Sequence, residues 1–460
     1  MRKGILLLFV GVLITVTAQA QTQITGQDTV RISLQEAINT ALKNNYQLKQ
    51  AENNLSLAQQ QILGAKANFL PSVSGNLRAQ TTKGQQFNNT TLSLENAVRN
   101  SISGGLSGNL TIFQGFTNIM NLRRSNVNED YQKASESRTQ ETVIFNAASG
   151  FLQVVLNQQL LNIAQENLVS AQEQLKQVKA QVDVGSRPTV DLYNQQSTVA
   201  SDELTVTQRE NNLSYSKTQL IGTLQLDPQK EYAFDAPDLE DLNPTPQNLS
   251  LSNLIDQALA NRNDLQAQKL LIKRNHDDLQ LARANYFPTI SANFGINSDY
   301  FDTYRIATQN GRTTVNFNDQ FFTQNVNKYI GLSINVPIFN NLNTRLNVES
   351  SQINYKNSKL QYQNLKYSVL QEVRQAYNDY QSYAKQLTST QKALQAAEKS
   401  YQTQKERYQV GAGTLVELSN ANAQYVQAQS ERAQAILQFM FQQKLLNYYL
   451  GKLDKNIELQ

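Results

Sequence analysis

The residues that could support catalysis in this chain are few, and their spacing argues against an enzyme. The single histidine, His276, lies in an Asn-His-Asp-Asp segment beside Asp277 and Asp278, where it could in principle transfer a proton or bind a metal ion. One histidine cannot complete both a catalytic triad and a ligand set. We therefore interpret His276 as a solvated helix residue and the two aspartates as surface charges. Ser107 lies among glycines, but not with the spacing of a nucleophile elbow.

The chain has no cysteine, which excludes disulfides and thiolate metal ligands. Phosphate-binding loop motifs are also missing. The sequence therefore predicts no catalytic residues, no metal site and no cofactor.

Two acidic residues are more informative, because they recur in the same context. Asp191 and Glu417 each follow a Val-Gly pair by six residues, and each precedes a leucine. The segment Asn-Phe-Leu-Pro-Ser-Val-Ser at 68–74 likewise returns as Asn-Tyr-Phe-Pro-Thr-Ile-Ser at 285–291. Such long-period similarity indicates a duplicated half-molecule, which fixes the fold class before any element is assigned.

The domain organisation follows from this duplication. A basic start, an apolar run and Ala-Gln-Ala at 18–20 are typical of a secretory signal peptide. A segment with four prolines lies between the copies and cannot continue a helix. We expect a signal peptide at 1–20, a first repeat at 21–226, a linker at 227–249, a second repeat at 250–451 and a tail at 452–460.

Each repeat contains a pair of segments with strict two-residue alternation, at 72–112 and 289–338. In the first pair, Leu106 and its apolar neighbours alternate with polar residues such as Ser107, and Leu332 lies in an equivalent pattern in the second. Runs of about ten residues match the length of a tilted strand that crosses a bilayer. We expect Leu106 and Leu332 to face lipid and Ser107 to face water. A soluble sandwich with one polar face is the alternative interpretation.

Aromatic residues gather where the strands meet the helices, as in the interfacial belt of a membrane barrel. They are Phe69, Phe113, Phe116, Tyr286, Phe287 and Phe339. Residues 81–99 and 298–327 are expected to be loops at the opposite ends of the strands.

Long helices make up most of the remaining chain. Helices are predicted from Leu34 to about Asn68, at 117–183 and at 343–409, with Pro71 ending the first one. The two long helices would each extend about 100 Å. Leu161 begins a seven-residue repeat of apolar residues that is typical of a coiled coil.

Four strands cannot close a barrel, and a membrane barrel must have no open edge. The smallest such barrels have eight strands, so the chain must oligomerise; a dimer would supply eight strands and a trimer twelve. Without Arg2 and Lys3, the remaining 39 basic and 37 acidic residues give a net charge of +2, which argues against a nucleic-acid partner.

The chain resembles the outer-membrane efflux factor family typified by TolC. The resemblance rests on the paired strands with Phe-x-Pro-type junctions and on the motif Tyr-Gln-Val-Gly-Ala-Gly-Thr-Leu-Val-Glu-Leu at 408–418, and it covers both halves. It implies an α+β membrane protein built from two internal repeats: a trimeric transmembrane β-barrel, four strands per chain, continued by a long α-helical periplasmic barrel. It also implies location in the cell outer membrane, contact with its lipid, and partners comprising a periplasmic adaptor and an inner-membrane pump of the RND, ABC or MFS type.

The same resemblance implies where the gate lies. Asp191 and Glu417 match acidic positions that face the aperture, and Tyr408 matches a tyrosine that holds the tip closed. Gly413 stands where the family can place a gating arginine, Arg187 occupies the equivalent position of the first copy, and Asn420 replaces a further acidic residue. The residues expected to contact the adaptor are Gly185, Ser186, Gly411, Ala412 and Gly413.

The predicted function is therefore an outer-membrane channel of a tripartite efflux or export system, giving passive exit to substrates. A type I protein secretion channel and a porin without pump coupling remain alternatives. A periplasmic coiled-coil adaptor is a further one, although such a protein would not need four alternating strands with aromatic ends.

Overall fold

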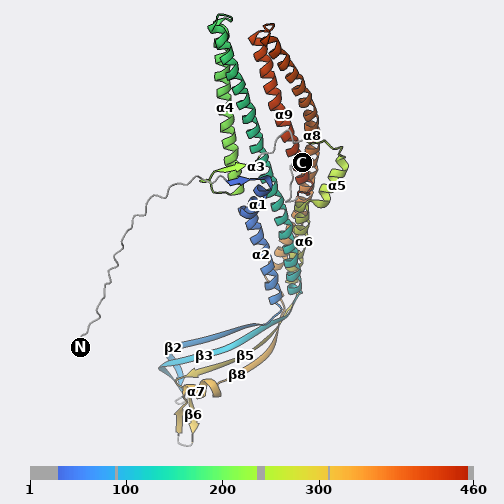
Figure 1. Cartoon of the computed structure of the whole chain (residues 1–460). Coiled ribbons are helices and arrows are strands. Elements are labelled where there is room, and N and C mark those ends of the chain that lie inside the picture. The colour runs from blue at the N-terminus through green and yellow to red at the C-terminus, as the bar shows by residue number, and fades with distance from the viewer. Residues whose placement is uncertain (1–29, 89–91, 236–243, 309–310, 454–460) are drawn as a thin grey trace, which may run out of the picture.

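The computed structural model describes residues 30–88, 92–235, 244–308 and 311–453. The signal peptide expected at 1–20 lies outside the described residues, as do part of the linker and most of the tail. The molecule is elongated, with a β-sheet at one end and two helical hairpins at the other (Figure 1). None of the described helices is both long and apolar enough to cross a membrane.

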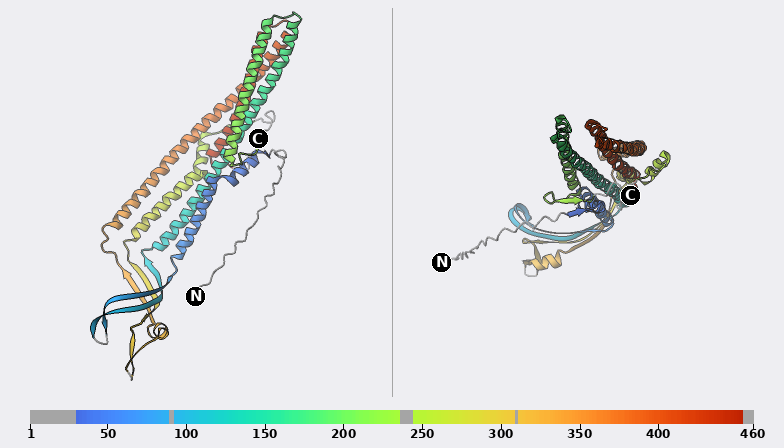
Figure 2. Two further views of the ribbon diagram at one scale, coloured as in Figure 1. Left: turned by 90° about the vertical axis from the view of Figure 1, so that its left-hand side faces the viewer. Right: turned by 45° about the horizontal axis from the view of Figure 1, so that its top comes forward.

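The sheet consists of four antiparallel strands in the order β2-β3-β5-β8. The strands are β2 (Ser72–Asn88), β3 (Ser93–Gln114), β5 (Thr289–Phe301) and β8 (Asn327–Asn335). The sheet is strongly curved (Figure 2). The outer edges of β2 and β8 have no partner strand within the described residues.

The pairing register places the apolar residues of all four strands on one face. Leu106 lies opposite Gly75 on one side and Ile296 on the other, and Leu332 lies opposite Ala292. The opposite face is polar: the hydroxyls of Ser74 and Ser107 lie 3.1 Å apart, and the Asn293 amide donates to Ser333 at 3.1 Å. The predicted alternation is thus confirmed, and the apolar face lies exposed in the single chain.

The strand ends differ from those expected. Residues 81–99 are mostly not a loop, because β2 and β3 continue through them as a long hairpin. Residues 298–327 include the end of β5, the hairpin β6 (Arg305–Thr308) and β7 (Gly311–Thr314), helix α7 (Phe317–Asp319) and the π-helical turn η1 (Gln320–Gln324). Strand β8 also ends at Asn335, three residues before Ile338. In the β2–β3 hairpin the backbone pairing thus continues beyond the apolar alternation, whereas in β8 it ends before the alternation does.

The helix expected from Leu34 to Asn68 is two helices, α1 (Leu34–Asn44) and α2 (Tyr46–Ala67). Asn45 separates them, because its side chain caps α2 by accepting the Leu48 N–H at 3.0 Å. The second half shows the same break at Arg262, between α5 (Leu251–Asn261) and α6 (Asn263–Ala284).

The two long helices have the predicted bounds. Helices α3 (Thr117–Asp183) and α8 (Asn343–Gln409) contain 67 residues each. They turn back into α4 (Thr189–Leu224) and α9 (Leu415–Tyr449). Each long helix begins after a non-glycine residue with positive φ, Phe116 at 64° and Leu342 at 63°. These residues turn the chain sharply out of the sheet.

Near the sheet the helices lie side by side in the order α2-α3-α6-α8. The strands leave the sheet in the same order, so α2 and α8 stand at the two edges of the molecule. Towards the other end, α3 packs on α4 and α8 packs on α9, and α3 also contacts α9.

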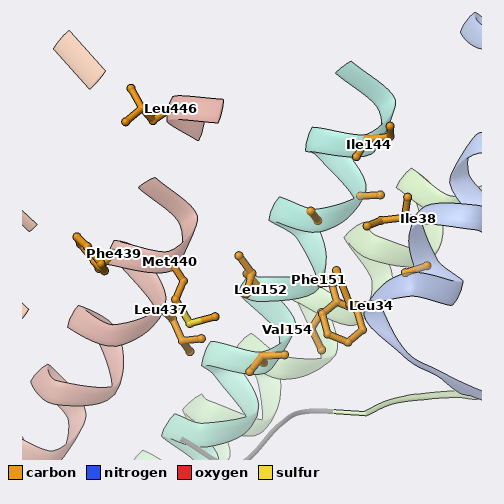
Figure 3. Packing of buried hydrophobic residues seen from close by; sticks show 14 of the residues in the cluster. Leu34, Ile38, Ile144, Phe151, Leu152, Val154, Leu437, Phe439, Met440 and Leu446 are labelled. Atoms are coloured by element: carbon orange, nitrogen blue, oxygen red, sulfur yellow. The ribbon is translucent and has the colours of Figure 1, made fainter. Parts of the chain in front are cut away.

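The main hydrophobic core lies at mid-length, where the interrupted helices break. Side chains from α1, α3 and α9 meet there, including Leu34, Phe151 and Phe439 (Figure 3). A short parallel pair covers this region: β1 (Val30–Ile32) pairs with β4 (Tyr232–Phe234). Strand β4 lies in the segment expected to be only a linker.

A buried ion network lies beside this core. The Arg262 guanidinium, 3% exposed, binds both oxygens of Asp264 at 2.6 and 3.0 Å and the Glu372 carboxylate at 2.5 Å. Arg138 lies 3.8 Å from Asp264 and 2.9 Å from Glu141. Burial opposes the charged forms, but these contacts raise the pKa of Arg262 and lower the pKa of Asp264. The network joins α6, α8 and α3 at the helix break.

Candidate gate at the helical tip

Two similar turns form the end of the molecule opposite the sheet. In the α3–α4 turn, Gly185 has φ 71° and the Ser186 N–H donates to the Gln181 carbonyl at 2.8 Å. In the α8–α9 turn, Gly411 has φ 77° and the Ala412 N–H donates to the Arg407 carbonyl at 2.8 Å. A bond of this kind across a left-handed glycine is the usual end of a helix.

The tip residues named from the sequence lie together on these turns. Gly185, Ser186, Gly411 and Ala412 are exposed, and Gly413 is partly exposed. The Ser186 hydroxyl donates to the Gln181 carbonyl at 2.7 Å, and Arg407 donates to the Ala412 carbonyl at 3.1 Å. The turns are therefore exposed and are held by hydrogen bonds within each turn.

Three of the four predicted gate residues meet between the two hairpins. The Arg187 guanidinium, in the α3–α4 turn, forms an ion pair at 3.5 Å with Asp191, in the first turn of α4. It also lies over the Tyr408 ring, 4.2 Å from its centroid, and Tyr408 belongs to the other hairpin. Cation–π contacts of this geometry contribute about 0.5–2 kcal/mol.

Tyr408 packs against three other buried residues at the tip. We define the tip cluster as Val178, Tyr408, Leu415 and Leu418. The Tyr408 side chain is 7% exposed, and its hydroxyl forms no hydrogen bond in this single chain. Burial raises the pKa of the Tyr408 phenol, an effect that nearby Arg187 opposes and Asp191 reinforces. The ring is therefore a neutral platform for the Arg187 cation, and its buried hydroxyl can accept or donate one further bond.

The fourth residue, Glu417, has a different partner. Its carboxylate accepts the Thr414 N–H at 3.0 Å, and its own N–H donates to the Thr414 hydroxyl at 3.2 Å. This reciprocal pair is a capping box at the start of α9, and the backbone hydrogen bond to Thr414 is the main cause of a lowered pKa of Glu417. Glu417 is exposed and thus carries a fixed negative charge at the tip.

Several residues of this site escaped the sequence analysis. Val178, Leu415 and Leu418 pack under Tyr408, and Thr414 orients Glu417. The Thr-x-x-Glu spacing was a readable signal for the cap. Packing between Val178 and Tyr408 had no local signal, because the two residues lie in different halves of the chain.

One interpretation near the sheet was wrong. Asp277 is not a surface charge: its side chain is fully buried on α6, with the Arg123 guanidinium 3.2 Å away on α3. Asp278, also on α6, forms an ion pair with Arg124 of α3. His276 is partly exposed and stacks edge-on against Tyr355, at 5.4 Å between ring centroids. This group joins α6 to its neighbours.

Comparison with known proteins agrees with this architecture. The family model described as "Outer membrane efflux protein" matches residues 37–224 and 254–452. "Outer membrane protein TolC" of Escherichia coli K12 is 22% identical over 361 residues, 77% of this chain and 71% of that protein. "Outer membrane efflux protein BepC" of Brucella suis is 19% identical over 417 residues, 90% of this chain and 84% of that protein.

Solved structures show the same fold. The CmeC outer membrane channel of Campylobacter jejuni superposes with a TM-score of 0.78 at 18% identity, covering 93% of this chain and 87% of that one. The CusC structure, described as forming a transmembrane channel, gives a TM-score of 0.75 at 19% identity and covers 94% of this chain and 95% of that one.

Proposed function

The chain belongs to the outer membrane efflux protein family, and we propose that it is the outer-membrane exit channel of a tripartite efflux or export system. One observation carries this proposal: a four-stranded curved sheet with a continuous exposed apolar face, joined directly to helices that extend far beyond it. An apolar face of this kind suits lipid, and polar helices of this length suit the periplasm. The channel is passive, and we assign it no catalytic role and no cofactor.

A homotrimer is the assembly that we propose. Strands β2 and β8 leave two open edges, and three copies joined edge to edge would close a twelve-stranded barrel. The edge helix α8 supports this arrangement, because an apolar row with seven-residue spacing lies more than half exposed along it. The row consists of Leu346, Ile353, Leu360 and Tyr367. Helix α2, at the other edge, also exposes Leu57 and Leu63.

The trimer proposal predicts that Ile353→Asp will reduce assembly, because burying an Ile side chain contributes about 1.5–3 kcal/mol per subunit and a buried carboxylate reverses the gain. We expect the fraction of trimer in size-exclusion light scattering to fall sharply. Gln352→Asp is the matched control, since Gln352 is exposed and points about 100° away around the helix. Equal trimer fractions in the two variants would remove α8 from the interface.

At the other end of the molecule, we propose that the exposed turns contact a periplasmic adaptor, which couples the channel to an inner-membrane pump. The equal lengths of α3 and α8 and the similar turns support a tip built from two repeats per subunit. Three subunits would present six such turns around one opening. Arg187, Asp191 and Tyr408 would hold each pair of turns together in the closed state.

The channel function and the acidic tip can be tested together in planar bilayers. The reconstituted protein is expected to conduct ions with a preference for cations, because fixed acids ringing a narrow opening attract them. Asp191→Asn combined with Glu417→Gln should reduce this preference and weaken block by multivalent cations. Glutamine retains the capping box, so the helix start survives the loss of charge.

The two single variants separate the roles of the acids. Because Arg187 pairs with Asp191 whereas Glu417 is exposed and its carboxylate accepts the Thr414 N–H, Glu417→Gln should account for most of the change in selectivity. Wild-type selectivity in the double variant would mean that both carboxylates serve the turns alone. A protein that never conducts would contradict the channel itself.

A further inference from the structure

A compact group of aromatic rings lies where β5 ends and β8 begins, at the end of the sheet away from the helices and from the aromatic belt there. We define this aromatic patch as Tyr300, Phe317, Phe321 and Phe322. Phe317 stacks on Phe321 at 5.2 Å between centroids, Tyr300 meets Phe317 edge-on at 5.2 Å, and Phe322 meets Phe321 edge-on at 5.2 Å. Phe322 nevertheless remains 67% exposed. In Figure 1, α7 lies beside the far end of the sheet.

The patch lies on the apolar face of the sheet. Tyr300 is paired with Ile102 and therefore points to the same side as Leu106. Gly104 lies on this side too, and a Cβ added to it would be 3.0 Å from the Phe321 ring. The missing side chain of Gly104 makes room for Phe321, so the patch continues the apolar face across the strand end.

Polar side chains fasten the patch to the free edge of β5, where the pairing with β8 has ended. The buried Gln320 amide donates to the carbonyls of Phe301 and Val315 and accepts the Phe301 N–H. Ser298 donates to the Phe321 carbonyl at 2.5 Å, and Asn325 donates to the Asp299 carbonyl at 2.6 Å. These bonds satisfy the unpaired backbone of β5 and fix the rings in place.

The distance between the aromatic patch and Phe113 matches the thickness of the apolar part of a membrane. From Phe113, at the helix end of β3, to Gly104 is nine residues, or about 30 Å along the strand. With the usual tilt of about 40°, this distance spans about 23 Å across the bilayer, close to the ~25 Å apolar band of an outer-membrane barrel. The aromatic patch therefore lies at the boundary opposite to Phe113.

We propose that the aromatic patch is a lipid anchor, with Phe317, Phe321 and Phe322 inserted among the acyl chains of the outer leaflet at its interface with water. This inference rests on the proposed location of the sheet in the outer membrane. Aromatic rings favour this depth, because it accepts an apolar body next to polar surroundings. Helix α7 would then hold these rings at a fixed depth on the lipid side of the barrel.

The test exploits the absence of tryptophan from this chain. Phe322→Trp gives a single fluorophore in the full-length protein, which is reconstituted into phosphatidylcholine vesicles with bromine at shallow or deep acyl positions. We expect strong quenching, greater with shallow than with deep bromine, and little quenching by aqueous iodide.

Two reference variants calibrate the measurement. Ile330→Trp lies near the middle of the apolar band, because Ile330 pairs with Phe294, which pairs with Gly108, so deep bromine should quench it more strongly. Tyr193→Trp, on α4 near the tip, should respond to iodide alone.

The outcomes separate the two proposals. Strong iodide quenching of Phe322→Trp would place the patch in water, and insensitivity to both quenchers would place it against protein; either result overturns the anchor. Failure of bromine to quench Ile330→Trp would instead contradict the membrane location of the sheet, and with it both proposals.

Discussion

Replacing Arg262 with methionine is expected to lower the free energy of unfolding by about 3–5 kcal/mol, because it leaves the carboxylates of Asp264 and Glu372 without their cation. Denaturation in detergent, followed by circular dichroism, measures the loss. Arg262→Lys should recover part of it, since lysine keeps the charge but not the two-pronged bond to Asp264. The matched control is Arg31→Met, which removes a surface pair with Asp235 and should cost at most about 1 kcal/mol.

This prediction also has a pH dependence of defined sign. The pKa of Asp264 is lowered in the folded protein, where the bonds to Arg262 outweigh burial. Its stabilising contribution is therefore complete above its unfolded pKa of about 3.9 and is lost as the pH falls through the lower, folded value. The stability difference between wild type and Arg262→Met should narrow below about pH 4. A constant difference down to pH 2 would mean that the Asp264 charge contributes nothing.

The second large effect is expected on the apolar face of the sheet. Leu106→Arg and Leu332→Arg should each destabilise the proposed membrane-inserted barrel by about 2–4 kcal/mol per subunit, because both side chains are exposed on the apolar face that we propose contacts lipid. The yield of folded oligomer in the outer-membrane fraction should fall accordingly. Ser107→Arg is the control: it adds the same charge one residue away, on the polar face where Ser107 meets Ser74. Equal yields from all three variants would contradict the assigned faces.

The parts of the fold with a strong periodic signal were predictable from sequence. Helices at 117–183 and 343–409 have the expected bounds, because both segments lack proline and each ends at a glycine turn. The faces of Leu106 and Ser107 were also predictable, since a two-residue period assigns side chains to opposite sides of a strand.

The missed features depend on partners that the local sequence does not reveal. Asn45 ends one helix and begins another through a single side-chain bond, without the proline or glycine that usually marks a break. Strands β2 and β3 continue beyond the apolar band because they pair with each other, although the sequence there is polar. Asp277 is buried on α6 with Arg123 of α3 3.2 Å away, a contact that the sequence around Asp277 does not reveal.

The candidate site likewise combines contacts that the local sequence predicts with contacts that depend on distant residues. Arg187 lies in the α3–α4 turn and Asp191 in the first turn of α4, only four residues away, so nearness in sequence favours their ion pair. The contact of Arg187 with Tyr408 joins two hairpins distant in sequence and needed the structure. Assigning Glu417 to the gate overlooked its capping box with Thr414. The role of its charge at the opening stays a prediction.

The contact between Arg187 and Tyr408 has a consequence for how an opening transition would be controlled. Both residues belong to one chain, so their effective concentration is set by the covalent connection and stays high however far the protein is diluted. Each subunit would carry its own intramolecular latch, which can release and re-form without separating from its neighbours. A trimer with such latches could pass through partly open states with one or two released, so that conductance would rise in steps.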